Sequence, residues 1–256
     1  MLILSLDTSS RGGSCALVRD ERVLREQAGD SSRDQAERLP GELAALLERE
    51  SSALCEIDCF AVATGPGSFT GLRVGIATMQ GLAMATGKPL IGVSAFDALA
   101  AAGASAARYR PYIRGAGAAE RTRQDRIVTW VDAWRGEVFS AVYEDGRELG
   151  APTVARPDDL LSRLRGQMAL FTGDGVARYQ ERIRATLGEA ARFTDPEAPL
   201  LAGVVAALAL DAFRAGQRPR PHAIRPLYLR RSDAELARDA GDAHAPADPK
   251  ASSGIP

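Results

Sequence analysis

The sequence predicts an α/β fold made of two halves that open in the same way. Short apolar runs alternate with segments whose apolar or small residues recur at helical spacing, a pattern typical of α/β proteins. Asp7 ends the apolar run at 2–6, and Asp132 ends the run "IVTWVD" in the second half. This repetition indicates a duplicated unit. With 256 residues, 45% of them hydrophobic, the chain holds one large α/β domain or two small ones.

Three strand-like runs open the first half and are expected to form an antiparallel meander. Leucines at helical spacing then predict a helix, with Pro40 early in the element. A buried strand, a second helix, a further strand and the start of a third helix follow. In chain order, these elements are expected at residues 2–6, 14–20, 21–29, 35–50, 59–64, 70–86, 88–94 and 95–102.

A hairpin is predicted to open the second half, and a proline-flanked helix follows it. A strand then runs into the glycine turn of "MALFTGDG", and two further helices come next. The proline-spaced segment at 218–233 is expected to be extended. The hairpin strands and the helices are expected at 127–133, 136–145, near 157–165, 176–191 and 200–215.

Composition divides the chain into four segments. Between the halves the periodicity is lost and six arginines appear, which indicates a surface excursion that is either a solvated loop or a contact for a nucleic acid or protein partner. The C-terminal residues are rich in Ala, Asp, Pro, Gly and Ser, which is typical of disorder. The predicted segments are a first α/β lobe at 1–102, an arginine-rich excursion at 103–126, a second α/β lobe with the C-terminal helices at 127–233, and a disordered tail at 234–256.

Charge and cysteine usage favour a cytoplasmic protein with no membrane partner. Lysine plus arginine (32) nearly balance aspartate plus glutamate (33), so no global field attracts nucleic acid or an anionic membrane. The longest apolar run, at 200–210, is shorter than the ~20 residues that span a bilayer. The count of three cysteines is odd, and the N-terminus lacks the basic region of a signal peptide.

The histidines and cysteines of the sequence give little support for catalysis or metal binding. His222 and His244 lie in a proline-rich segment and in the tail, so they offer no triad and no metal cluster. Cys55 and Cys59 have a spacing that matches no zinc or redox motif. We therefore interpret them, together with Cys15, as core cysteines.

The stretch "ATGPGSFTGLRVG" at 63–75 either cradles a phosphate or presents a helix. It lacks the lysine of a P-loop, is one residue too long for G-x-G-x-x-G, and contains Pro66, which has no N–H to donate. A tight turn remains, with Ser68 or Thr70 as the N-cap of a helix. Glycine in a helix costs roughly 0.5–1 kcal/mol relative to alanine, so several of them imply the close approach of another backbone. That backbone belongs to the protein's own sheet or to a second chain.

The turn "LDTSS" after the first strand also has two interpretations. An aspartate at the end of a buried strand, followed by small hydroxyl residues, holds a metal–phosphate group or caps a backbone turn. The residues concerned are Asp7, Thr8 and Ser9.

Several segments, in order along the chain, resemble the TsaB (YeaZ) family. They are "ILSLDTSS", "GPGSFTGLRVG", "GKPLIGVSAFDALA", "VDAWRGEVFSAVY", "TGDG" and "PLYLRR". The resemblance implies an actin-like ATPase fold of the sugar kinase/Hsp70 type, with two related lobes that are each a mixed sheet with helices. It also implies a non-catalytic subunit of the machinery that makes threonylcarbamoyladenosine beside the anticodon of tRNA. By this resemblance the subunit needs no cofactor, and ATP and a metal ion belong to the partner subunits.

The resemblance implies TsaD and TsaE as partners, and contact with tRNA only through the complex. It also implies that the helical face of the first lobe that binds TsaD forms a homodimer when the chain is alone. The glycine side of the helix is expected to pack on the partner, with Arg73 as a polar anchor, so that Gly75→Arg blocks docking and leaves the helix folded. Asp7, Thr8 and Ser9 become a vestigial phosphate-type loop without catalytic or metal-binding residues. The residues expected at the partner interface are Gly65, Pro66, Gly67, Ser68, Phe69, Thr70, Gly71, Arg73 and Gly75.

One departure and one alternative accompany this interpretation. Many family members have a histidine just before the second helix, where this chain has Asp34 and Gln35, so any role of that histidine is absent here. The alternative is an ATP-dependent phosphotransferase of the same fold, in which Asp7 and Asp132 position magnesium and phosphate.

Overall fold

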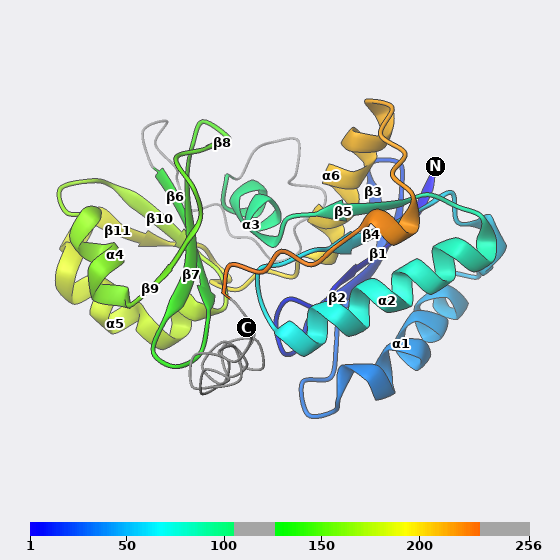
Figure 1. Cartoon of the computed structure of the whole chain (residues 1–256), viewed down its shortest axis with the longest axis horizontal. Helices are drawn as coiled ribbons and strands as arrows, with labels where there is room; N and C mark the ends of the chain where they lie inside the picture. The colour runs from blue at the N-terminus through cyan, green and yellow to red at the C-terminus, as the bar shows by residue number, and fades with distance from the viewer. Residues whose placement is uncertain (105–125, 231–256) are drawn as a thin grey trace, which may run out of the picture.

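The computed structural model describes residues 1–104 and 126–230, which form two lobes that each contain one sheet (Figure 1). The excursion expected at 103–126 lies outside the described residues except at its two ends, and the tail expected at 234–256 lies outside them entirely. None of the helices in the described ranges is long and apolar enough to cross a membrane.

The first sheet has the strand order β3-β2-β1-β4-β5. The opening three strands form the predicted antiparallel meander, and β4 and β5 continue the sheet parallel to β1. Every residue of β1 is buried because helices cover both faces of the sheet, in keeping with its largely apolar sequence. The strands are β1 (Leu2–Asp7), β2 (Ser14–Arg19), β3 (Arg22–Ala28), β4 (Cys59–Ala63) and β5 (Leu90–Val93).

The second sheet repeats this plan in the order β11-β10-β6-β7-β8, with β9 also paired to β7. Its opening strands are antiparallel, and β10 and β11 then extend it parallel to β6. The prediction of two related α/β lobes, each a mixed sheet with helices, is therefore confirmed. The strands are β6 (Arg126–Asp132), β7 (Val138–Glu144), β8 (Arg147–Glu148), β9 (Thr153–Ala155), β10 (Ala169–Thr172) and β11 (Ala191–Phe193).

Alternate residues of the first sheet enter two separate cores. Leu4, Phe60 and their neighbours face α1 and α2, whereas Ile3 and Ala61 face α3 and α6. In the second lobe, Trp130 and Phe171 meet edge to face and lie in a third core with α4 and α5. The helices are α1 (Gln35–Arg49), α2 (Phe69–Thr86), α3 (Ala95–Gly103), α4 (Pro157–Arg163), α5 (Gly175–Leu187) and α6 (Ala202–Arg214).

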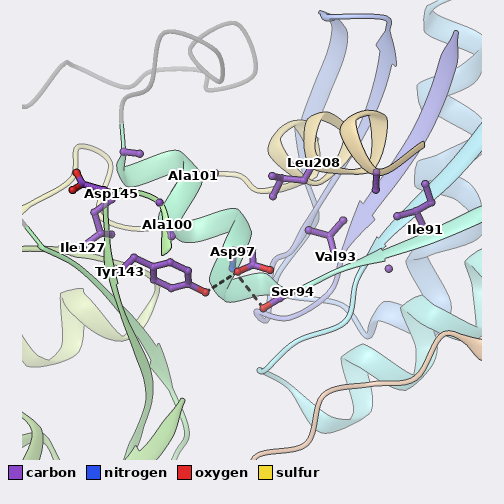
Figure 2. Close-up of a pocket in the computed structure, with 14 residues that line it drawn as sticks. Ile91, Val93, Ser94, Asp97, Ala100, Ala101, Ile127, Tyr143, Asp145 and Leu208 are labelled. Carbon is purple, nitrogen blue, oxygen red and sulfur yellow. Dashed lines mark hydrogen bonds between the residues drawn. The ribbon is translucent and has the colours of Figure 1, made fainter. Parts of the chain in front are cut away.

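Helix α3 lies between the two lobes (Figure 1). It is capped by Ser94, whose Oγ accepts a hydrogen bond from the backbone N–H of Phe96 at 3.2 Å. All of its residues except Asp97 are buried. The Tyr143 hydroxyl on β7 donates to Asp97 Oδ1 at 2.8 Å, which ties the second lobe to this helix (Figure 2).

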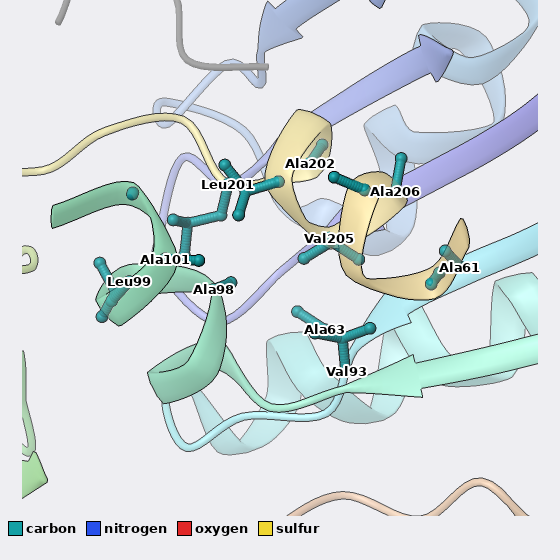
Figure 3. Close-up of a cluster of buried hydrophobic side chains, with 14 of the residues drawn as sticks. Ala61, Ala63, Val93, Ala98, Leu99, Ala101, Leu201, Ala202, Val205 and Ala206 are labelled. Carbon is teal, nitrogen blue, oxygen red and sulfur yellow. The ribbon is translucent and has the colours of Figure 1, made fainter. Parts of the chain in front are cut away.

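Helix α6 packs on the first sheet, although the sequence analysis grouped it with the second lobe. Its small apolar residues meet those of β4 and β5, as Val205 does beside Ala63 and Val93 (Figure 3). The Ser14 hydroxyl on β2 accepts hydrogen bonds from the backbone N–H groups of Leu201 and Ala202, at 3.2 and 3.0 Å. These bonds satisfy donors at the start of α6 that have no partner within the helix.

Candidate functional site

The glycine-rich loop before α2 folds against the turn after β1. The backbone N–H of Ser68 donates to the Ser9 carbonyl at 2.7 Å, and a Cβ on Gly67 would lie within 3.0 Å of the Ser9 backbone. The Ser68 hydroxyl accepts a hydrogen bond from Gly71 N–H, so Ser68 rather than Thr70 is the N-cap of α2. The two motifs singled out in the sequence therefore form one packed unit.

The glycine side of α2 faces the turn after the protein's own first strand. A Cβ on Gly71 would lie 2.5 Å from the Thr8 carbonyl oxygen, and one on Gly75 would lie within 3.0 Å of the Thr8 side chain. Both glycines are buried. The prediction that this side packs on a second chain is wrong, because the close approach that the glycines permit is already used inside the lobe.

A different face of α2 is exposed. Met84 is 66% exposed, and a Cβ on Gly81 would meet nothing within 4 Å. Residues three or four apart lie on one side of a helix, so the exposed positions form a continuous stripe. Most of its side chains are small, and none is acidic. We call it the α2 stripe; its members are Thr70, Arg73, Ala77, Gly81, Met84 and Ala85.

Arg73 joins the N-terminal end of the α2 stripe to the C-terminal segment. Its guanidinium carbon lies 3.9 Å from the centre of the Phe69 ring, and its Nε donates to the Tyr228 hydroxyl at 2.8 Å. The rings of Phe69 and Tyr228 are 5.0 Å apart between centroids. The sequence analysis did not place Tyr228 at this site, although it lies in the segment "PLYLRR" that supported the family resemblance.

In the turn that contains Asp7, Thr8 and Ser9, side chains accept hydrogen bonds from backbone N–H groups of the same turn. Asp7 Oδ1 accepts a hydrogen bond from Ser9 N–H at 2.9 Å, and the Ser10 hydroxyl accepts one from Gly13 N–H at 3.0 Å. These backbone donors are therefore engaged, whereas a phosphate loop leaves such groups free for its ligand. Burial raises the pKa of Asp7.

Asp174 of the second lobe lines a cavity of about 290 Å³ together with Asp7 and Leu99, among others. Asp132 Oδ1 accepts from Trp134 N–H at 3.0 Å, so Asp132 closes the turn after β6 much as Asp7 closes the turn after β1. Its other carboxylate oxygen pairs with Arg178 at 2.9 Å. Burial, with a smaller effect of nearby carboxylates, raises the pKa of Asp174 to about 6. No cluster of three or more metal-binding side chains occurs in the described ranges.

The cysteines divide into two kinds. Cys15 and Cys59 are buried, and burial raises the pKa of each thiol to about 12, so they are core cysteines as predicted. Cys55 is exposed, and the prediction of a core position is wrong for it. It lies in a single turn of 3₁₀-helix, Leu54–Glu56, whose residues are not buried.

Comparison with known proteins places these features in a family. The family described as "TsaD: tRNA N6-adenosine threonylcarbamoyltransferase" matches residues 27–238. An uncharacterized Mycobacterium leprae protein is 34% identical over 62% of this chain, and the match spans 40% of that protein's length. The tRNA threonylcarbamoyladenosine biosynthesis protein TsaB of Haemophilus influenzae is 30% identical over 71% of this chain and 75% of its own length.

Among solved structures, YeaZ from Pseudomonas aeruginosa superimposes with a TM-score of 0.66 at 27% identity, and the match covers 89% of this chain and 100% of that one. The two-lobe architecture is therefore common to both proteins. On the family match, the TsaB relative and this structure together, the chain belongs to the TsaD family and, within it, to the TsaB (YeaZ) proteins.

Proposed function

We propose that this chain is a non-catalytic subunit for the biosynthesis of threonylcarbamoyladenosine in tRNA, and that it binds TsaD through the α2 stripe. The exposed stripe is the observation that carries the proposal. Small residues such as Ala77 and Gly81 allow a partner helix to approach closely, and Met84 adds an adaptable apolar contact. Arg73 and Tyr228 supply polar groups at one end of the stripe, as expected at the rim of an interface.

The names of relatives support the pathway. TsaB proteins of Haemophilus influenzae, Escherichia coli and Bacillus subtilis are all described as tRNA threonylcarbamoyladenosine biosynthesis proteins. By extension we assign this chain to the same modification in the cytoplasm, with TsaE as the further partner and tRNA reached through the complex. ATP and the metal ion of the reaction are then held by the partner subunits.

The turn after β1 supports a non-catalytic role. A phosphotransferase of this fold needs free donors around the phosphates and a carboxylate free to position the metal ion. Here Ser9 N–H is bonded to Asp7, and Asp132 is bonded to Trp134 N–H and Arg178. The phosphotransferase alternative is therefore the weaker of the two.

Reconstitution with purified TsaD and TsaE tests the proposal. We expect modified tRNA only when all subunits are present, and no magnesium-dependent ATP hydrolysis by this chain alone. Ala77→Arg on the α2 stripe should abolish co-purification with TsaD through steric bulk and an added charge. Ala185→Arg, at an exposed alanine of α5, is the matched control and should bind normally.

Two results would overturn the proposal. Binding of TsaD by Ala77→Arg with unchanged affinity would exclude the α2 stripe. ATP hydrolysis by the isolated chain that disappears in Asp7→Ala would favour the phosphotransferase.

A further inference from the structure

A cavity of about 550 Å³ lies between the lobes, apart from the turn at Asp7. Helix α3 forms one wall, β5 and α6 a second, and the ends of β6 and β7 a third (Figure 2). It shares no lining residue with the cavity at Asp7 and Asp174. Its volume falls in the range of about 300–1,000 Å³ that is typical of small-molecule sites. The apolar lining includes Ile91, Val93, Ala101, Ala104, Ile127 and Leu208.

Polar groups gather on the α3 side of this cavity. The Tyr143 side chain points toward Asp97, and its hydroxyl donates to Asp97 Oδ1 (Figure 2). Tyr143 is only 4% exposed, and burial, followed by the hydrogen bond to Asp97 and the charge of that carboxylate, raises the pKa of its hydroxyl, which therefore stays protonated and keeps donating. This bond fixes the Asp97 carboxylate, which is exposed, at the cavity wall.

Among the described residues, the charged side chains of the cavity have a single sign. Asp97 and Asp145 line it, and no lysine, arginine or histidine within residues 1–104 and 126–230 does. Burial and the charge of Asp97 raise the pKa of Glu148, so a third carboxylate feels the same field. No ion pair involving these three carboxylates occurs between residues of the described ranges. Negative charge that is uncompensated beside apolar walls favours a cation, because the low dielectric strengthens the attraction.

We propose that this cavity binds a small organic cation, an ammonium or guanidinium group joined to an apolar body. The cationic group donates to the carboxylate of Asp97, with Asp145 adding to the potential. The apolar body lies against Ala101 and Leu208, whose burial drives the association. Because the walls come from both lobes, such a ligand also holds the lobes together. The inference does not depend on the proposed binding of TsaD.

Ligand-detected NMR and calorimetry on the full chain with 2-phenylethylamine test the proposal. We expect saturable binding of the amine and none of 3-phenylpropionate, which has a similar apolar body and the opposite charge. Asp97→Asn keeps the acceptor for Tyr143 and removes the charge, so it should weaken binding by about tenfold or more. Ala212→Phe fills the cavity without changing its charge and should also abolish binding. Asp159→Asn, at an exposed residue of α4, is the control.

Any one of three results would overturn the proposal that the cavity binds an organic cation. Equal binding of the amine and the carboxylate, or equal amine affinity in Asp97→Asn and the native chain, would overturn the assignment. Absence of saturable binding by 2-phenylethylamine, benzamidine and agmatine to the folded chain would also overturn it. Asp97→Asn should still co-purify with TsaD. A negative result for the cavity therefore leaves the α2 stripe untouched, and a negative result for the α2 stripe leaves the cavity untouched.

Discussion

The side chain of Thr8 occupies the space beside Gly75, so that a Cβ on this glycine would lie within 3.0 Å of the Thr8 Oγ1 and Cγ2 atoms. Helix α2 therefore contacts the turn after β1 with no room for a methyl group. The same helix carries Gly81 on its open side, where a Cβ would meet nothing within 4 Å.

These two glycines make a matched pair for stability measurements. Gly81→Ala should raise the free energy of unfolding by roughly 0.5–1 kcal/mol, because alanine has the higher helix propensity and meets no obstacle. Gly75→Ala gains the same propensity but overpacks Thr8, so it should lower stability by about 1–3 kcal/mol. Denaturant unfolding of both variants measures the difference. Equal stabilisation by the two substitutions would show that Thr8 moves aside without cost.

The same contact changes the outcome expected for Gly75→Arg. From the sequence we predicted a folded variant that fails to dock. With Thr8 in contact, we now expect loss of the fold, detected as loss of the native circular dichroism spectrum.

Asp174 should make stability fall as pH rises. Its pKa of about 6 in the folded chain lies above the ordinary value of 3.8, so the folded state retains a proton that the unfolded state has lost. Stability is therefore fully present below pH ~4 and is lost as pH rises through ~6. Asp174→Asn has no carboxyl group to titrate, so it does not lose stability as pH rises, and it can still accept a hydrogen bond from Asp132 N–H. It should exceed the native chain by roughly 2 kcal/mol at pH 8 and match it at pH 4.

Urea unfolding of both proteins between pH 4 and pH 8 measures this effect. The exposed Asp159→Asn should follow the native chain throughout. A constant difference between Asp174→Asn and the native chain at every pH would exclude titration as the cause.

Ser14→Ala should destabilise the contact between β2 and α6. The Ser14 hydroxyl is the acceptor for two buried N–H groups, at Leu201 and Ala202, and the alanine leaves both without this partner. We expect a loss of about 1–3 kcal/mol. Thermal unfolding measures it, with Ser162→Ala as the control, because the Ser162 hydroxyl donates to Asp159 at an exposed position. A loss no greater than that of the control would show that other groups replace the hydroxyl.

Asparagine in place of Arg135 should stabilise the turn between β6 and β7. Arg135 and Gly136 have φ angles of 55° and 78°, and Glu137 N–H donates to the Trp134 carbonyl across them. A left-handed conformation costs an ordinary residue roughly 1–2 kcal/mol, and asparagine tolerates it better. Arg135→Asn creates the Asn-Gly pair that two-residue hairpin turns favour, but it also removes an interaction of the arginine side chain, so we expect a gain of at most about 0.5–1 kcal/mol. An unchanged or lower melting temperature would mean that the arginine side chain contributes more than the turn conformation costs.

Local patterns in the sequence were sufficient for the order of the longer elements and for the likeness of the lobes, but they did not predict the short strands β8, β9 and β11. Asp7 and Asp132 close equivalent turns because both follow the first strand of a lobe, and that position can be read from the apolar run before each. Local chemistry narrowed the N-cap of α2 to Ser68 or Thr70, and the hydrogen bond from Gly71 N–H identifies Ser68.

The direction in which a helix faces depends on distant residues. Small residues recur on α2 at helical spacing, but only the position of Thr8 determines which of them are buried. Helix α6 is apolar on most sides, so its sequence does not distinguish one sheet from the other; its place is fixed by Ser14, far away in the chain. Likewise, nothing local links Asp97 to Tyr143, whose hydrogen bond forms part of the cavity between the lobes.

The return of α6 to the first sheet determines the order in which the lobes can be completed during synthesis. The strands of the second sheet all lie between residues 126 and 193, ahead of the helix that completes the first lobe. On the ribosome, the first sheet therefore emerges early but waits, with its Ile3 and Ala61 face uncovered by α6, until residue 214 has been made. The second lobe is the earlier of the two to have all its described elements, so we expect the N-terminal half of this protein to finish folding last.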